Sequence, residues 1–262
     1  MSQTKAELLD GKSATVNLKN PATADNSTMN LVLQTGETDI AGDDVIGKIA
    51  FQAPDEGTGT DAVLVAAAIQ ARSETDFSSS ANATSLDFMT GASEAAAKQW
   101  SLLSTGHWLP AATDHGIYLG VTAATAANLL DDYEEGSWTP VLGSTGSYSG
   151  QGYDAQVGSY TKIGRQVTLH MQIILNDAGT VGDFSTIFGL PFTPVAASEG
   201  SIPISVWKIT LTSGHTPTAI FYTGGSARIY LQQQDGAGVL DQIAASGVAD
   251  DARLYMTATF LV

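Results

Sequence analysis

The first candidate for a functional site in this sequence is its densest group of charges, the acidic run over residues 131–135. The run holds four carboxylates, those of Asp131, Asp132, Glu134 and Glu135. Carboxylate oxygens are the ligands that hard cations such as Ca²⁺ prefer. However, the spacing does not match a calcium loop of the EF-hand type, and a run of like charges is usually a solvated face. We therefore expect no metal site, and these four residues are only weak candidates for one.

The histidines offer no metal or catalytic array either. The sequence has four of them, at His107, His115, His170 and His215, and no cysteine. They lie far apart and form no H-E-x-x-H pattern, so neither zinc catalysis nor a thiolate zinc site is indicated, and no cofactor is expected. His215 is the histidine that we expect to bind a ligand, because the surrounding segment Ser213–Pro217 has the composition of an exposed loop.

Paired carboxylates, as in a glycoside hydrolase, are also not indicated. Such enzymes hold two carboxyl groups roughly 5 to 10 Å apart, one of them often with a raised pKa. The acidic residues after Trp138 lie mostly in glycine-rich turns, where solvent keeps carboxyl pKa values near normal. Neither a Gly-x-Ser-x-Gly elbow nor a phosphate-cradling glycine loop followed by lysine occurs. The sequence is therefore predicted not to be an enzyme.

Charge and hydropathy exclude two classes of partner. The 262 residues include 11 Lys+Arg against 27 Asp+Glu, which gives a formal charge of −16. The cations are spread singly between Lys5 and Arg253, so binding of nucleic acid is not expected. No stretch approaches the roughly 20 apolar residues that span a bilayer, and residues 1–12 lack the apolar run of a secretion signal. We expect neither membrane insertion nor secretion by that route.

Short apolar runs separated by glycine turns predict strands in the first half. These runs are Asn30–Gln34, Val45–Phe51 and Thr84–Met89. Two alanine-rich segments also suit a helix, because alanine is the best helix former. The regular spacing of the turns favours a strand over residues 62–72. Residues 93–103 stay open between helix and strand.

The first half has too few bulky side chains to form a core alone. Most acidic residues precede Trp138, and most aromatic residues follow it. Short hairpins of small side chains bury little surface against roughly 1–2 kcal/mol of backbone entropy per ordered residue, and an isolated hairpin is marginal at best. Association of several copies would cover these faces and pair their edges. We therefore predict a thin, intertwined homo-oligomeric shaft.

The second half predicts a compact antiparallel unit. Its clearest hairpin joins Ser159–Ile163 to Gln166–Leu175, where apolar and polar residues alternate with a period of two. Glycine and proline turns between several short strands predict a β-sandwich or jelly-roll-like knob, and Gly224-Gly225 suggests a tight hairpin. Further strands are expected at Trp138–Leu142, Thr186–Gly189, Ile202–Leu211, Thr218–Thr223, Ala227–Gln233 and Leu254–Leu261.

The run Asn128–Leu142 contains the unusual sequence LDDYEEGSWTP. It resembles the junction before the C-terminal domain of bacteriophage tail fibres, particularly those of marine phages. Gly158–Gly164 and Ile187–Phe192 follow in the same order. Upstream, Ala81–Gly91 and Leu103–Gly106 resemble shaft segments. The resemblance covers roughly residues 30–195.

This resemblance implies an all-β, homotrimeric fibre made in the host cytoplasm and assembled into the virion tail. It implies a virion-attachment segment over residues 1–28 that meets other tail proteins, a trimeric β shaft over 29–127, an acidic junction over 128–137, and a receptor-binding knob over 138–262. The implied function is attachment to the host surface through a glycan or another envelope receptor. The alternative is a structural fibre or decoration protein without a receptor, on the head or on a tail adaptor.

Tips of such fibres bind glycans, whose CH faces stack on exposed aromatic rings while hydroxyls hydrogen-bond to polar side chains. Tyr148 and Tyr153 are candidates because they lie in a glycine- and serine-rich segment expected to be a loop. An equally plausible role for tyrosines in strands is to fill the core or a subunit interface. With His215, the full set of candidate ligand-binding residues is Tyr148, Tyr153, His215, Tyr222, Arg228 and Tyr230.

Overall fold

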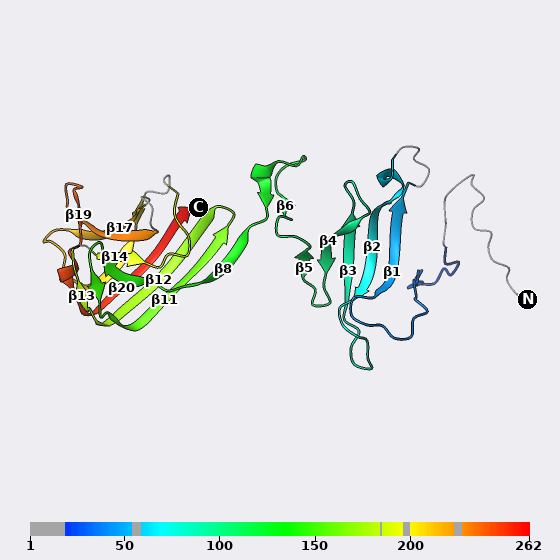
Figure 1. The fold of residues 1–262 in the computed structure, drawn as a ribbon, viewed down its shortest axis with the longest axis horizontal. Helices are drawn as coiled ribbons and strands as arrows, with labels where there is room; N and C mark the ends of the chain where they lie inside the picture. The colour runs from blue at the N-terminus through cyan, green and yellow to red at the C-terminus, as the bar shows by residue number, and fades with distance from the viewer. Residues whose placement is uncertain (1–18, 54–58, 184, 196–199, 223–226) are drawn as a thin grey trace, which may run out of the picture. The chain divides into compact units, whose positions relative to one another are not determined.

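The protein is nearly all β structure, as its sequence predicts (Figure 1). A computed structural model describes residues 19–53, 59–183, 185–195, 200–222 and 227–262, and not the side chains of Val181 and Tyr222. Among these residues, helical structure consists of three-residue 3₁₀ turns, and every strand pair is antiparallel. Residues 1–18 of the expected virion-attachment segment and the turn at Gly224-Gly225 lie outside the described residues.

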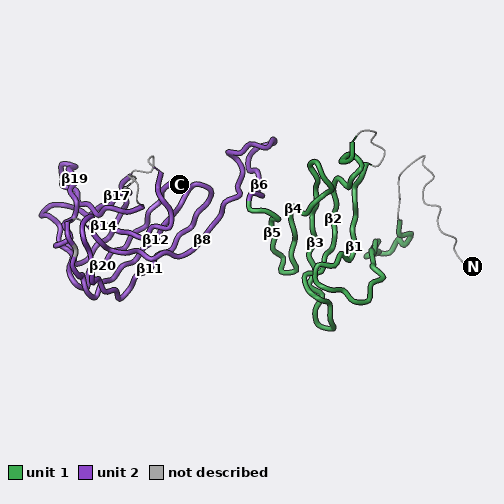
Figure 2. Tube along the Cα trace, viewed as in Figure 1, with its two compact units in different colours: residues 1–113 green, residues 114–262 purple. Residues whose placement is uncertain are grey.

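The chain divides into two compact units, residues 1–113 and residues 114–262 (Figure 2). We call them unit 1 and unit 2. The described residues of unit 1 form a five-stranded sheet in the order β1-β2-β3-β4-β5. Because each strand pairs with the next in sequence, the sheet is a simple meander. The elements of unit 1 are β1 (Val45–Gln52), η1 (Asp61–Val63), β2 (Val65–Ser73), β3 (Thr84–Thr90), β4 (Ala97–Leu102) and β5 (Trp108–Pro110).

The structure decides the uncertain segments of unit 1. The strand predicted over residues 62–72 is confirmed as β2, and the open segment 93–103 contains strand β4. In contrast, the strand predicted over Asn30–Gln34 is wrong, because no strand is formed there. Leu33 lies instead against Gly47 of β1, where a Cβ added to the glycine would lie 3.2 Å from the Leu33 Cβ. The segment therefore contacts the sheet by a side chain rather than by pairing with its edge.

Unit 2 contains two larger sheets and two short strand pairs, β6 with β7 and β10 with β13. The order β16-β20-β12-β11-β8 defines what we call the β12 sheet, and the order β15-β17-β18-β14-β9, with β19 beside β18, defines the β18 sheet. The elements of unit 2 are β6 (Ile117–Tyr118), η2 (Ala126–Asn128), β7 (Leu129–Leu130), β8 (Tyr133–Trp138), β9 (Val141–Ser144), β10 (Tyr148–Ser149), β11 (Gly152–Ile163), β12 (Gln166–Asp177), β13 (Thr180–Val181), β14 (Ser185–Phe188), β15 (Ser201–Ile202), β16 (Ile204–Ile209), β17 (Thr216–Tyr222), β18 (Arg228–Gln234), β19 (Leu240–Gln242), η4 (Ala245–Gly247) and β20 (Val248–Leu261).

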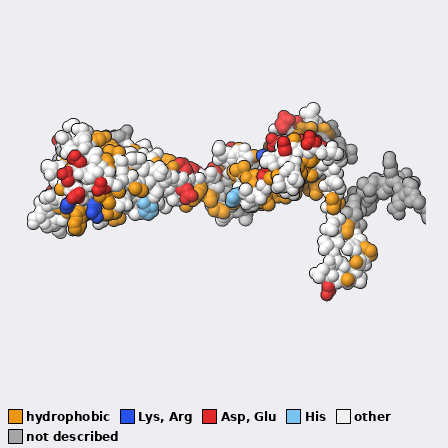
Figure 3. Space-filling view, turned by 90° about the horizontal axis from the view of Figure 1, so that it is seen from below, with side chains coloured by type: hydrophobic (Ala, Val, Ile, Leu, Met, Phe, Trp, Pro, Cys, Tyr) orange, Lys and Arg blue, Asp and Glu red, His pale blue; other side chains and the backbone are white. Residues whose placement is uncertain are grey.

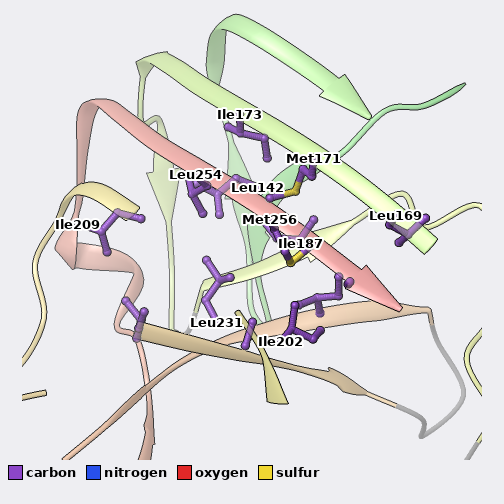
Figure 4. Close-up of a cluster of buried hydrophobic side chains, with 14 of the residues drawn as sticks. Leu142, Leu169, Met171, Ile173, Ile187, Ile202, Ile209, Leu231, Leu254 and Met256 are labelled. Atoms are coloured by element: carbon purple, nitrogen blue, oxygen red, sulfur yellow. The ribbon is translucent and has the colours of Figure 1, made fainter. Parts of the chain in front are cut away.

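The two sheets of unit 2 share one hydrophobic core (Figure 4). Residues of β12 and β20 alternate between buried and solvent-facing, as expected for a sheet with one face on a core and one on water. The β18 sheet contributes the opposite layer. Side chains that are completely buried in this core include Leu142, Leu169, Ile173, Leu175, Ile187, Ile229, Leu231 and Leu254.

Prolines mark two places where the chain passes from one sheet to the other. The single strand predicted over Trp138–Leu142 is wrong: β8 ends at Trp138 in the β12 sheet, and β9 begins at Val141 in the β18 sheet. The strand predicted over Ile202–Leu211 is likewise divided between the two sheets at Pro203. Proline has no N–H to donate to a ladder, so a strand ends readily beside it.

Candidate functional surfaces of the two units

Three side chains stack on the outer side of the β18 sheet. The rings of Tyr148 and Phe188 lie 5.3 Å apart, nearly parallel at 17°, and the Arg228 guanidinium carbon lies 5.6 Å from the centre of the Phe188 ring. Short strand β10 brings Tyr148 over Gly143 of β9, where a Cβ would come within 3.0 Å of the Tyr148 ring. Two of the predicted residues thus meet through Phe188, which no sequence motif marks for a role in binding.

Tyr153 has a structural position. It lies in strand β11 rather than in the predicted loop, and it is half-buried against the core. Its hydroxyl accepts a hydrogen bond from the Leu142 N–H (3.2 Å) and faces the Leu142 carbonyl (3.5 Å). Burial raises the pKa of the Tyr153 phenol above its ordinary value. The hydroxyl therefore ties β11 to β9 across the two sheets.

Three candidates remain, in two different places. His215 lies in the turn before β17, with Nδ1 3.3 Å from the Ser213 carbonyl and Nε2 3.8 Å from Asp241 Oδ2. Tyr230 is partly buried in β18 opposite Thr186. The backbone of Tyr222 pairs with Arg228 at the end of β17, while its side chain lies outside the described residues. Tyr222 and Tyr230 are therefore neighbours of Arg228 on β17 and β18, whereas Tyr153 and His215 lie apart from that group.

The acidic run forms the edge strand of the β12 sheet. Strand β8 begins at Tyr133 and pairs with β11. Lys162 pairs with the Asp132 carboxylate, and the Tyr160 hydroxyl donates to Glu134. That hydrogen bond to a carboxylate raises the pKa of Tyr160. Within a single chain, the described residues include no group of three or more histidines and carboxylates placed to hold a metal ion.

The outer face of the β12 sheet is a polar surface with exposed aromatic rings, and it was not among the surfaces predicted from sequence. Cross-strand pairing aligns Val157, Gln172, Tyr255 and Ser205 in one row. An adjacent row contains Arg253 and Trp207, which lie opposite each other on β20 and β16. Trp207 is 61% exposed and Tyr255 40%. The alternating pattern of β20 was the available signal, since it places Arg253, Tyr255 and Thr257 on the solvent side.

This surface is hollowed. A concavity of about 650 Å³ is lined by side chains from β11, β12, β16 and β20, among them His170, Gln172, Ser205 and Tyr255. His170 Nδ1 lies 3.0 Å from the Thr257 hydroxyl. In Figure 3, the C-terminal unit shows Lys or Arg side chains beside acidic and hydrophobic ones, with a histidine further along. We use the name outer groove for this concavity together with the adjacent row. It comprises the lining residues Val157, His170, Gln172, Ser205, Tyr255 and Thr257, and Trp207 and Arg253 of the adjacent row.

One face of the unit 1 sheet is apolar, and in the single chain it is covered only in part, by Leu33 over Gly47. Pairing of the five strands aligns two cross-strand rows, and neither row contains a charged residue. Phe51 is 55% exposed, Ile49 45% and Trp108 57%. The Phe88 and Trp108 rings from the two rows lie 5.2 Å apart. The rows consist of Ile49, Ile69, Phe88, Trp100 and Pro110, and of Gly47, Ala71, Leu86, Leu102 and Trp108; together with Phe51 they form what we call the apolar face.

The opposite face of the unit 1 sheet is held by a buried carboxylate. Asp87 is 1% exposed; it accepts hydrogen bonds from Ser101 Oγ (2.6 Å) and Arg72 Nε (2.9 Å). Burial disfavours the charged form, but the hydrogen bonds from Ser101, Arg72 and Gln70 outweigh it and hold the pKa of Asp87 below its ordinary value. Arg72 also pairs with Asp43. This network joins β2, β3 and β4. The contacts that the structure describes around Asp87 suggest no catalytic or binding role for it.

Comparisons with known proteins give a structural similarity but no match in sequence. No family model matches the sequence, and no curated protein matches it. In the described part of the chain, no helix is long and apolar enough to cross a membrane. The crystal structure of the Dettilon tailspike protein is similar to part of the chain, with a TM-score of 0.40 and 16% sequence identity. The match covers 49% of this chain and 23% of that protein, so the chain spans less than a quarter of its length.

Proposed function

We propose that this chain is a structural protein of a phage tail fibre that attaches the virion to the host cell surface. In this proposal unit 1 belongs to a homotrimeric shaft, and unit 2 is a knob that binds surface glycan without catalysis. The N-terminal segment over residues 1–28 joins the fibre to other virion tail proteins. The motif resemblance in residues 30–195 supports the class of protein, and the shapes of the two units support the division of labour.

The observation that carries the proposal is the apolar face of unit 1. A sheet that exposes phenylalanine, tryptophan and isoleucine side chains in adjacent rows has a large free-energy gain available from covering them, about 25 cal/mol for each Å² removed from water. Another copy of the same sheet presents the same uncharged face. Unit 2 has no comparable need, because its two sheets cover each other. This difference favours a shaft ordered by several chains.

The shaft is tested by the mass of the full-length protein in solution. We expect light scattering to give the mass of three chains for the wild type, and a smaller mass for the double variant Phe51→Ser, Trp108→Ser. Leu109→Ser is the matched control, since Leu109 is 49% exposed on the opposite face of the same sheet. A wild-type monomer with a folded unit 1 would contradict the proposed shaft.

Attachment is tested by competition. Purified full-length protein should reduce adsorption of the phage that carries it to that phage's host cells. Several knobs on one particle act at a high effective concentration, so weak single sites can still give firm adsorption. Labelled antibody that decorates the capsid, together with unchanged adsorption, would instead support the alternative of a fibre or decoration protein without a receptor.

A further inference from the structure

We propose that the outer groove of the β12 sheet is the saccharide-binding site of unit 2, and that it takes an acidic saccharide, one bearing carboxylate groups. The proposal rests on the proposed function and places the site on a different sheet from the tyrosines predicted by sequence. Trp207 and Tyr255 supply the stacking surfaces, and Arg253 between them supplies the positive charge.

The first argument is the combination of exposed rings with unused polar groups. Sugars present CH faces that pack on aromatic rings and hydroxyls that both donate and accept hydrogen bonds. The Trp207 and Tyr255 rings are open to solvent on adjacent rows. The Gln172 amide and the hydroxyls of Ser205 and Tyr255 make no side-chain hydrogen bond to any described residue. Gln172, Ser205 and Tyr255 line the same concavity of about 650 Å³, and Trp207 lies beside it in the adjacent row.

The second argument is charge. Arg253 is exposed, and no hydrogen bond or ion pair joins it to the residues that the structure describes, although its charge adds to that of Lys208 in lowering the pKa of Asp251. The neighbouring carboxylate, Asp251, is already paired with Lys208 at 2.8 Å. In a chain with a formal charge of −16, an unpaired guanidinium beside two exposed rings is a distinct local feature. Arginine binds carboxylates through its fork of N–H donors, so a carboxylate-bearing ligand complements it.

The third argument distinguishes this groove from a contact between copies of the chain. A protein interface of fixed shape would have to desolvate Arg253, Gln172 and the serine hydroxyls, and each buried polar group left without a partner costs about 1–3 kcal/mol. A saccharide brings its own donors and acceptors, with bridging water where the fit is imperfect. The apolar face of unit 1 lacks these polar groups. The outer groove therefore favours a hydroxyl-rich ligand.

The test uses full-length protein on an array of neutral and carboxylate-bearing oligosaccharides, with galacturonate and glucose oligomers of equal length as the defined pair. We expect binding to carboxylate-bearing members, with an affinity that falls as salt is added, because exposed charges are screened. Trp207→Ala and Tyr255→Ala should each weaken binding at least fivefold. Arg253→Gln should abolish the preference for carboxylate-bearing members.

Tyr118→Ala is the matched control, because Tyr118 is 44% exposed, close to the 40% of Tyr255, but lies in the β6–β7 pair. It should bind as the wild type does. Near-ultraviolet circular dichroism checks that each variant is folded. The proposal is overturned if no carboxylate-bearing saccharide binds, if Tyr148→Ala abolishes binding while Tyr255→Ala does not, or if Trp207→Ala changes the mass of the oligomer instead of saccharide affinity.

Failure of this site and failure of the proposed function give different results. If wild-type protein blocks adsorption and Trp207→Ala blocks it equally well, the chain is a receptor-binding protein whose site lies elsewhere. If neither protein blocks adsorption, while the array still shows binding that depends on Trp207, the groove binds saccharide but the attachment role is wrong. The adsorption assay and the saccharide array together therefore show whether the site, the attachment role or both are wrong.

Discussion

Units 1 and 2 are both antiparallel, but they stabilise their sheets in different ways. Among the described residues of unit 1, the buried hydrophobic side chains are Ala68 and Ala96, and the buried polar ones include Asp87, Ser85 and Ser101. Unit 2 holds the whole hydrophobic cluster between two sheets. A sheet with an ionic network on one face and a partly covered apolar face on the other is incomplete as a single chain. Unit 2, with two sheets packed around its own core, is complete as a single chain.

The largest expected effect breaks the core of unit 2. Leu142 is completely buried in β9 between the sheets, and Leu142→Ala removes its contacts and leaves a cavity. We expect a loss of about 2–5 kcal/mol in the free energy of unfolding, measured by urea denaturation. Hydrogen exchange followed by mass spectrometry should place the loss in unit 2. Val157→Ala, at a 57% exposed position on the same unit, should change the free energy by less than about 0.5 kcal/mol.

The corresponding substitution in unit 1 removes a buried polar side chain, the carboxylate of Asp87. Asp87→Ala removes the acceptor of Ser101 and Arg72 and leaves Arg72 with Asp43 alone. We expect a loss of about 2 kcal/mol, because hydrogen bonds to a charged group are stronger than neutral ones and the partners stay partly buried. Faster hydrogen exchange confined to β2, β3 and β4 would locate the effect. An unchanged exchange pattern would show that this network does not hold the sheet.

The same carboxylate should make unit 1 acid-sensitive. The pKa of Asp87 in the folded protein lies below its ordinary value of 3.8, so ionised Asp87 favours the folded state. That contribution is complete above the ordinary pKa and is lost as the pH falls through the lowered value. Thermal melts between pH 5 and pH 2 should show unit 1 losing stability at the acid end. Asp87→Asn should flatten this dependence; an equally steep decline in the variant would assign the sensitivity to other groups.

A smaller effect is expected from the packing of Gly158 against Trp138 in the β12 sheet. A Cβ on Gly158 of β11 would come 2.5 Å from the indole nitrogen of Trp138 on β8. Gly158→Ala therefore forces the indole to shift, and we expect a loss of about 1–2 kcal/mol. Urea denaturation followed by circular dichroism provides the measurement. Gly200→Ala is the control because a Cβ there meets nothing within 4 Å, and a similar loss in both variants would exclude the steric explanation.

The smallest expected effect concerns the surface ion pair between Lys208 and Asp251, in contrast to the buried network around Asp87. Asp251 accepts from Lys208 on the surface of unit 2, and this contact lowers the pKa of Asp251. Both side chains are exposed, so solvent and salt screen the attraction. Asp251→Asn should leave the urea midpoint within experimental error, in contrast to substitution of buried Asp87. A clear shift of the midpoint would mean that the surface pair is as important as the buried network.

Local sequence patterns predicted which side chains of a strand face the core. The alternation over Gln166–Leu175 predicted the buried face of β12, and the turn-spaced runs around Val45 and Thr84 predicted two strands of unit 1. The first prediction depends on the period of two within a strand, and the second on apolar runs bounded by turns. The prediction failed at Asn30–Gln34, where an apolar run contacts Gly47 without entering a ladder. Whether a run pairs with an edge depends on neighbours far away in the sequence.

Only the tertiary structure decided which solvent-facing residues meet. Trp207 and Arg253 belong to β16 and β20, and Tyr148 meets Phe188 through β10 and β14. Within each strand, the pattern shows that such residues point outward, but the pairing register determines the neighbour on the next strand. The register arises from packing of the whole sheet against its core. The all-β character and the poverty of the first half in bulky side chains were therefore evident from sequence, whereas the outer groove and the apolar face became evident only when the strands were placed side by side.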